Sequence, residues 1–282
     1  MEALESSSDD DVEEGDVAQD SIEFALGLSP TSIGRNSSHP PAEKILELWH
    51  VFLENFDLTK VVYGPTLRLT IQKAIVDLIS FPKSLEALLF AIYGAAVVSL
   101  NNHDCERRFG EPRKTLLARY RLATKAALSR AKLMGSANLA VLQALLIHLL
   151  STREVYDSRT LWTLTGVALR IAEGMGLHRD GSLLNLSPFE IELRRRVWWQ
   201  LKLLDGDTAE ASGSDKFGAL DTDPRSPKLP SDINDDELYK SMSSLPVSTD
   251  GATDMIFCAL RFDLPTYWTT PIATPRQQCN NG

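Results

Sequence analysis

The 282-residue chain has few cysteines and no hydrophobic run of membrane-spanning length. Its three cysteines, Cys105, Cys258 and Cys279, are far apart and form no CxxC pair. This spacing argues against a zinc site and against a disulfide framework, and it fits a reducing intracellular compartment. The longest uncharged apolar run, residues 87–98, is shorter than the about 20 residues of a spanning helix. We therefore expect a buried core helix there and no membrane partner.

Sequence patterns of common enzyme sites are also missing, because the chain has no P-loop, GxGxxG, GxSxG or HExxH motif. His148 lies in an apolar stretch and is interpreted as a core histidine, and His178 as a helix-terminal contact. The run Asp235-Asp236-Glu237 lacks the repeated carboxylates of a diphosphate-handling helix, so helix N-terminal acids are the favoured interpretation. Replacing both aspartates by Asn should then leave function intact. We expect no catalytic, cofactor or metal site.

The negative charge lies at the N-terminal end. Residues 1–40 hold ten acids and one base, which is −9, and the other 28 acids and 28 bases cancel. Such a composition cannot bury enough apolar surface to fold, so we predict a disordered acidic tail over residues 1–40. The alternation of Ile22, Phe24, Leu26 and Leu28 behind the acids is typical of disordered activation segments, although a solvated tail is the favoured interpretation.

From residue 41 onward the apolar residues recur at helical spacing. This pattern predicts helices over residues 41–56, 67–79, 85–100, 112–134, 137–150, 158–173, 187–205 and 253–264. The clearest start is Ser187-Pro188 with Glu190, a capping box. No useful strand alternation occurs, so we predict an all-α domain over residues 41–265. A long surface loop over 206–236 and an irregular tail over 266–282 complete the prediction.

Two basic segments have alternative interpretations. Residues 107–132 hold nine bases against Glu111, and a solvated face or protein contact is favoured over a DNA-contacting helix. Arg194, Arg195 and Arg196 spread around a helix, so they cannot all face one ligand. We favour a core helix whose arginines pair with acids on neighbouring helices over a ligand clamp. Arg195 and Trp199, at i and i+4, could also stack.

Four segments, at residues 170–180, 187–205, 229–238 and 251–257, resemble motifs of one family in the expected order. The chain resembles the middle homology domain, or fungal-specific transcription factor domain, of the fungal zinc-cluster (Zn2Cys6) transcription factors. The resemblance implies an all-α regulatory domain that modulates activity, dimerises or senses metabolites, without catalysis. The residues that carry this signature, with a structural or regulatory role, are Gly176, Leu177, His178, Arg179, Glu192, Arg194, Arg195, Arg196, Trp198, Trp199 and Asp205.

The chain departs from this family in two respects. The family's DNA-binding module needs six cysteines to hold two zinc ions, and residues 1–104 contain none. We therefore expect no zinc or other cofactor in this chain and only indirect contact with DNA. The family's helical domain also usually continues past residue 282, so the chain is expected to be either a shortened family member or a partial gene product.

These features lead to a ranked set of functions. The first is a nuclear transcription regulator of a metabolic or secondary-metabolite gene cluster, which acts with another regulator or by self-association and responds to a small-molecule effector. The second is a helical small-molecule-sensing or dimerisation module that acts through a partner regulator. In its sensing form, segments 85–100 and 137–150 wall a cavity, and Arg170 or Arg195 meets an acidic ligand. An all-α enzyme is the least favoured.

Overall fold

The computed structural model of the chain describes residues 39–77, 81–214, 223–246 and 251–269. The predicted acidic tail therefore lies almost entirely outside the described residues. Within them every regular element is helical, as the sequence predicts, and none of these helices is long and apolar enough to cross a bilayer. The main helices are α2 (Ala42–Asn55), α3 (Gly64–Val76), α4 (Lys83–Val98), α5 (Asn102–Phe109), α6 (Arg113–Arg130), α7 (Leu139–Ser151), α8 (Ser158–Gly174), α9 (Pro188–Ala211) and α10 (Ile256–Thr269).

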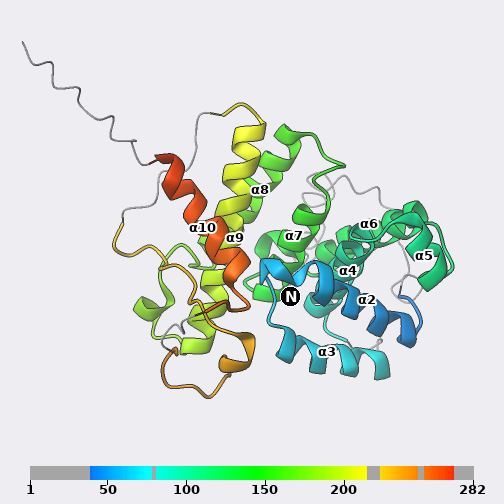
Figure 1. Cartoon of the computed structure of the whole chain (residues 1–282), viewed down its shortest axis with the longest axis horizontal. Helices are drawn as coiled ribbons and strands as arrows, with labels where there is room; N and C mark the ends of the chain where they lie inside the picture. Colours follow the sequence, from blue (N-terminus) through cyan, green and yellow to red (C-terminus); the bar gives the residue numbers. More distant parts are fainter. Residues whose placement is uncertain (1–38, 78–80, 215–222, 247–250, 270–282) are drawn as a thin grey trace, which may run out of the picture.

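Helices α4 and α7 form the centre of the molecule. Every residue of α4 from Glu86 to Val97 is buried, because this segment is apolar nearly all round its circumference. Helices α6, α7 and α2 pack against α4, and α8 and α9 run side by side next to α7 (Figure 1). One continuous apolar core joins α2 to α9.

The sequence pattern did not predict helix α5. This helix is short and largely polar, and Cys105 is its buried residue, so it carries no apolar periodicity. Local chemistry defines it instead. The Asn101 side chain accepts a hydrogen bond from the Asp104 amide at 2.8 Å, and Gly110 ends the helix with φ of 74°. Helix α6 ends at Arg130, before the predicted end at residue 134. Lys132, which follows it, lies in the left-handed region with φ of 52°.

Helix α9 begins as predicted and ends later. Both hydrogen bonds of the capping box between Ser187 and Glu190 are present. The helix runs to Ala211 instead of residue 205, because Thr208 and Ala209 remain buried on its inner side. Helix α10 lies on the other side of α9 from α8 (Figure 1).

The loop after α9 is only partly a surface loop, which corrects the prediction for residues 206–236. Ile233, near the end of that range, is buried against Phe189, and so are Leu238 and Met242 just beyond it, with Tyr63 packed beside them. These apolar residues follow no regular period, so periodicity does not reveal that they are buried. The segment thereby forms a second, smaller core on the outer side of α9.

Candidate functional site: a buried ion-pair network around α9

The three consecutive arginines of α9 reach three different segments. Arg194 Nη2 donates to the Met175 carbonyl at the end of α8, at 2.6 Å. Arg195 Nε and Nη2 donate to the two Asp180 carboxylate oxygens at 2.8 and 2.9 Å. Arg196 points elsewhere, because each residue turns the side chain by about 100°. Two of the three arginines thus pair with acids from other segments, as predicted, although those acids lie in loops and short 3-10 turns.

Arg196 forms the centre of a buried network. Its Nη1 lies 2.6 Å from Asp235 Oδ1, and its Nε lies 3.1 Å from Glu192 Oε1 one turn earlier. Arg196 and Glu192 are 1% and 0% exposed, so neither charge has access to water. Burial acts to raise the pKa of Asp235, but Arg196 and Lys60 together hold it below its ordinary value. Asp235 therefore remains a carboxylate between two cations.

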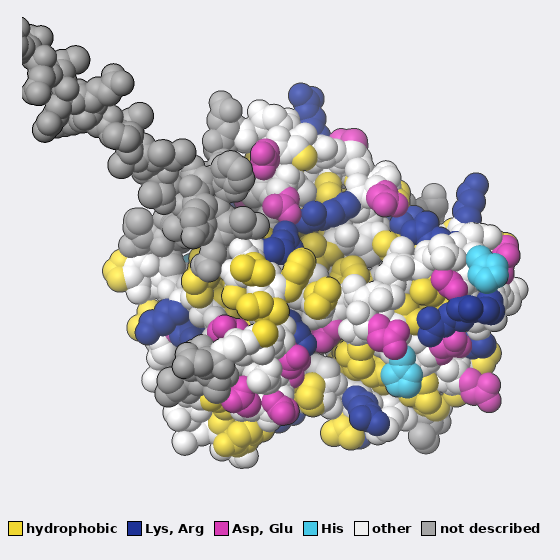
Figure 2. Space-filling model, viewed as in Figure 1, with side chains coloured by type: hydrophobic (Ala, Val, Ile, Leu, Met, Phe, Trp, Pro, Cys, Tyr) yellow, Lys and Arg dark blue, Asp and Glu magenta, His cyan; other side chains and the backbone are white. Residues whose placement is uncertain are grey.

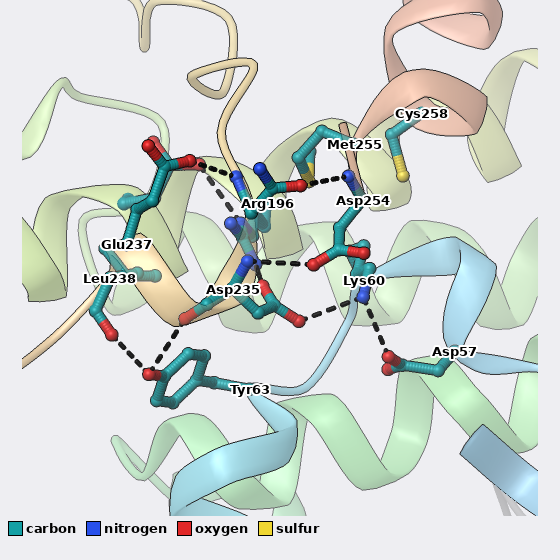
Figure 3. Close-up of polar contacts among 12 residues, drawn as sticks. Asp57, Lys60, Tyr63, Arg196, Asp235, Glu237, Leu238, Asp254, Met255 and Cys258 are labelled. Atoms are coloured by element: carbon teal, nitrogen blue, oxygen red, sulfur yellow. Dashed lines mark hydrogen bonds and ion pairs between the residues drawn. The ribbon is translucent and has the colours of Figure 1, made fainter. Parts of the chain in front are cut away.

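Lys60 connects this network to the start of the domain. It follows the 3-10 turn η2 (Asp57–Thr59) in the left-handed region, with φ of 48°. Its Nζ donates to Asp57 Oδ2 at 3.0 Å and to Asp235 Oδ2 at 2.9 Å (Figure 3). Burial raises the pKa of Asp57 to about 6, against the opposing effect of Lys60. The Asp57 Oδ1 atom has no hydrogen-bond partner among the described residues, which adds to the cost of ionising this carboxyl.

The 3-10 turn η5 (Asp235–Glu237) presents its backbone to the same network. Tyr63 OH, from the residue before α3, donates to the carbonyls of Leu238 and Asp235 (Figure 3). The Asp235 amide donates to Asp254 Oδ2 at 2.9 Å, just before α10. Four segments that are remote in the sequence thus meet at η5: residues 57–63, α9, η5 itself and the start of α10.

A second set of contacts fixes the chain that leads to η5. The Ser231 amide donates to Glu192 Oε2 at 3.0 Å, and the Lys228 amide donates to Asp180 Oδ2 at 3.0 Å. Trp199 Nε1 donates to the Lys228 carbonyl at 2.9 Å, and its ring lies 5.8 Å from the Phe262 ring. Arg195 is directed to Asp180, so its predicted stacking on Trp199 gives way to this ion pair.

The predicted signature at residues 176–179 forms the end of α8. The Gly176 and Leu177 amides donate to the carbonyls of Glu173 and Ala172, each at 2.9 Å, and Gly176 has φ of 77°. This is a Schellman motif, in which glycine is favoured because its φ is positive. Leu177 is buried, whereas Arg179 is exposed and its Nε donates to His178 Nε2 at 3.2 Å.

The remaining signature residues lie on α9 but outside the network. Trp198 is buried in the main core, and Asp205 is half-buried near the end of the helix. His148, interpreted as a core histidine, is 2% exposed, and burial, with Lys125 and Arg121 nearby, lowers its pKa to about 3. It is therefore neutral at physiological pH, and its Nε2 has no partner among the described residues.

The network holds distant segments of the chain together. The groups of the network face one another, and both oxygens of Asp235 already accept from cations. Among the described residues no group of three or more His, Cys, Asp or Glu side chains could hold a metal ion. The sequence interpretation missed Lys60, Asp57 and Tyr63. The sequence offered one weak indication that they are buried: Asp57 and Lys60 lie close to an apolar pair, Val61-Val62.

The sequence also matches known proteins. The fungal specific transcription factor domain family matches residues 76–213. The chain is 45% identical over 240 residues to the aurofusarin cluster transcription factor aurR2 of Gibberella zeae, covering 83% of this chain and 35% of the relative. It is 36% identical over 234 residues to the pyriculol/pyriculariol biosynthesis cluster transcription factor 1 of Pyricularia oryzae, covering 82% and 31%.

A third relative is the transcriptional regulator AacuB of Aspergillus aculeatus, 33% identical over 250 residues, covering 88% of this chain and 34% of the relative. The chain spans about a third of the length of these curated relatives. No solved structure matches it. The motifs at residues 170–205, the all-α fold and these relatives agree. The chain belongs to the family of fungal transcription regulators that carry the fungal specific transcription factor domain.

Proposed function

We propose that this chain is the regulatory helical domain of a nuclear transcription regulator that controls a secondary-metabolite biosynthetic gene cluster. The observation that carries the proposal is the similarity, over more than four fifths of the chain, to regulators named for such clusters. The buried network supports it, because its charged groups pair with one another inside the domain. We propose no enzymatic reaction for this domain.

The route to DNA is indirect in this proposal. A Zn2Cys6 module needs six cysteine ligands, and the 282 residues contain three cysteines. In this proposal the helical domain itself contacts promoters only indirectly, through a regulator that contains such a module. The domain itself needs no zinc and no other cofactor.

The experiment is a comparison of transcripts with and without the gene in the fungus that carries it. Loss of the gene is expected to change the transcripts of one biosynthetic cluster at least several-fold. The full chain should also co-purify from nuclei with a zinc-cluster protein. Unchanged cluster transcripts, together with protein found solely outside nuclei, would overturn the proposal.

Self-association is the other form of partnership, and α10 supports it. The outer face of this helix exposes Ile256, Phe257 and Leu260, with Leu260 60% exposed. Figure 2 shows apolar side chains gathered where Figure 1 places α10. Contiguous exposed apolar surface is typical of protein contacts. Light scattering should show a dimer that Leu260→Lys converts to monomer. Leu69→Lys, at the similarly exposed Leu69 of α3, should leave the dimer intact.

Metabolite sensing is the second candidate, and a surface groove favours it. The groove has a volume of about 670 Å³ and lies between α8 and the short turn η3 (Leu133–Gly135). Its walls include Val167, Ile171 and Met175, and Arg170 stands at its edge. This volume is in the range of small-molecule sites. Arg170 pairs with Glu173 at 2.7 Å and is exposed, whereas Arg195 is held by Asp180.

A thermal-shift experiment tests the groove. A panel of carboxylated aromatic metabolites should raise the melting temperature of the full chain, and Arg170→Gln should abolish the shift. Arg68→Gln, an exposed arginine on α3, is the matched control. A smaller pocket of about 230 Å³ touches α4 and α7 through Leu85, Leu88 and Ala140, but α3 and α9 also contribute to its wall. A shift that persists in Arg170→Gln would exclude the α8 groove.

A further inference from the structure

The basic residues of α6 divide into two sets on opposite flanks of the helix. On one flank, Arg119 pairs with Glu111, and Arg130 Nη2 lies 3.3 Å from Glu86. On the other flank, Arg121 and Lys125 are one turn apart, and neither forms an ion pair with a described residue. Part of the predicted basic segment is thus neutralised internally, whereas Arg121 and Lys125 are available to an anion.

The cations of the second flank, Arg121 and Lys125, are one helical turn apart and form no ion pair within the described part of the chain. Burial and the neighbouring charge of Arg113 lower the pKa of Arg121, and the exposed Glu154 opposes this effect. The Nε atoms of Arg113 and Arg121 have no hydrogen-bond partner among the described residues. Behind them is the 2%-exposed His148, whose unpartnered Nε2 feels the charges of Arg121 and Lys125. Crowded cations with unused donors are typical of an anion-binding surface.

Apolar side chains accompany these charges. Leu122 on α6 is 46% exposed, and Val155, in the connection from α7 to α8, is 52% exposed. Lys125 Nζ lies 5.4 Å from the centre of the Tyr156 ring in the same connection. We call Arg121, Leu122, Lys125, Val155 and Tyr156 the α6 cationic face.

The chain itself contains a segment of matching chemistry. Residues 1–38 hold ten acids and one base, and they include the apolar residues Ile22, Phe24, Leu26 and Leu28 directly after the acids. An acidic segment with spaced apolar groups complements a face that mixes arginine and lysine with leucine and valine.

The attachment point of this segment lies beside α6. The ring of His39 stacks on Phe90 of α4 at 4.1 Å, and its Nε2 lies 3.6 Å from Glu86, the carboxylate that also meets Arg130. A stretch of 38 residues spans up to about 125 Å, whereas the 18 residues of α6 are about 27 Å long. The segment therefore reaches any point of α6.

We propose that the α6 cationic face binds the acidic segment 1–38 of the same chain. The contact covers the segment in the absence of a partner and is weakened by salt. DNA is the less favoured occupant, because the rest of the chain has a net charge of zero and the segment adds −9. The inference goes beyond the proposed function and does not depend on it.

The test uses the full chain and a carbodiimide, which joins a carboxylate to a lysine amine with loss of water. Mass spectrometry should find links from residues 1–38 to Lys125 at least five-fold more often than to Lys73, an exposed lysine on α3. One molar NaCl should reduce the Lys125 links to the Lys73 level. The variant Arg121→Glu should do the same at low salt. The matched variant Arg68→Glu should retain the Lys125 links.

Three results would overturn the inference. Links spread equally over Lys125 and Lys73 show that the segment has no preferred site. Links found solely between isotopically distinct copies show binding to a second copy instead. The third result is binding of a random-sequence DNA duplex to the full chain that Arg121→Glu weakens, with no segment links to Lys125. It would assign the face to nucleic acid.

Discussion

Lys60 and Asp235 are 175 positions apart in the sequence, and their Nζ and Oδ2 atoms are 2.9 Å apart in the fold. Asp235 also meets Arg196, so a single carboxylate joins the start of the domain, α9 and the loop that follows α9. Replacement of one residue of this network by an uncharged one therefore leaves a buried charge without its partner.

Replacement of Arg196 by Met is expected to destabilise the domain by about 3–5 kcal/mol, because Glu192 and Asp235 lose their shared buried cation. Urea unfolding at pH 7 measures the change. Arg68→Met, at an exposed arginine of α3, should stay within about 0.5 kcal/mol of the unmodified chain. Equal unfolding midpoints for both variants would show that the network contributes little.

Asp235 and Asp236 should respond differently to replacement by Asn. Asp235 accepts from Arg196 and Lys60, so Asp235→Asn leaves two buried cations short of a counter-charge and should cost several kcal/mol, about 2–4. Asp236 is exposed, and Asp236→Asn should change stability by less than about 0.5 kcal/mol. The expectation from sequence that both replacements leave function intact stays a prediction, and the structure adds that only Asp235→Asn should reduce stability. Paired unfolding curves distinguish the two variants.

His148 should make the domain less stable as the pH falls. Its pKa is about 3 in the folded chain and about 6.5 when unfolded, so the unfolded chain binds the proton first. The contribution of neutral His148 to the free energy of unfolding is fully present above pH 6.5. Below pH 6.5 the free energy of unfolding declines by up to about 1.4 kcal/mol per pH unit. His148→Leu should flatten this decline between pH 6.5 and 4.5. An unchanged slope would show that another group controls it.

Asp57 should have the opposite pH dependence. Burial raises its pKa from 3.8 to about 6, so the folded chain binds a proton that the unfolded chain has released. The stability from this proton is complete below pH 4 and is lost as the pH rises to about 6. As the pH decreases from 6 to 4, protonation of Asp57 therefore stabilises the unmodified chain. The Asp57→Asn variant lacks this gain, so its free energy of unfolding should fall more steeply over this range than that of the unmodified chain. Denaturant titrations at three pH values test this, with Asp236→Asn as the control.

The end of α8 offers a backbone test. Gly176 has φ of 77°, and Gly176→Ala should cost about 1 kcal/mol, because the left-handed conformation is unfavourable for alanine. Gly174, the last residue of α8, has no atom within 4 Å of an added Cβ, so Gly174→Ala should stabilise by about 0.5–1 kcal/mol. Opposite shifts in melting temperature are the expected result. A rise for both variants would contradict the requirement for glycine at residue 176.

Much of the fold follows from local patterns in the sequence. The apolar segments at α4 and α7, the capping box at Ser187 and the glycine after α8 all act through neighbours within a few residues, so spacing alone predicts them. The short polar helix α5 was not predicted, because its start is defined by one side chain, Asn101, and its end by Gly110. Neither signal is strong without the structure.

The sequence by itself determined the helical class, the family and the position of the arginine run on α9. Only the tertiary structure decided what each arginine meets, because Asp180 and Asp235 lie in segments without a regular period. It likewise decided that Lys60 is buried and that the loop after α9 folds back into a core with Ile233 and Leu238. Ion pairs between remote positions depend on how the helices pack, and no local pattern in a single sequence encodes that packing.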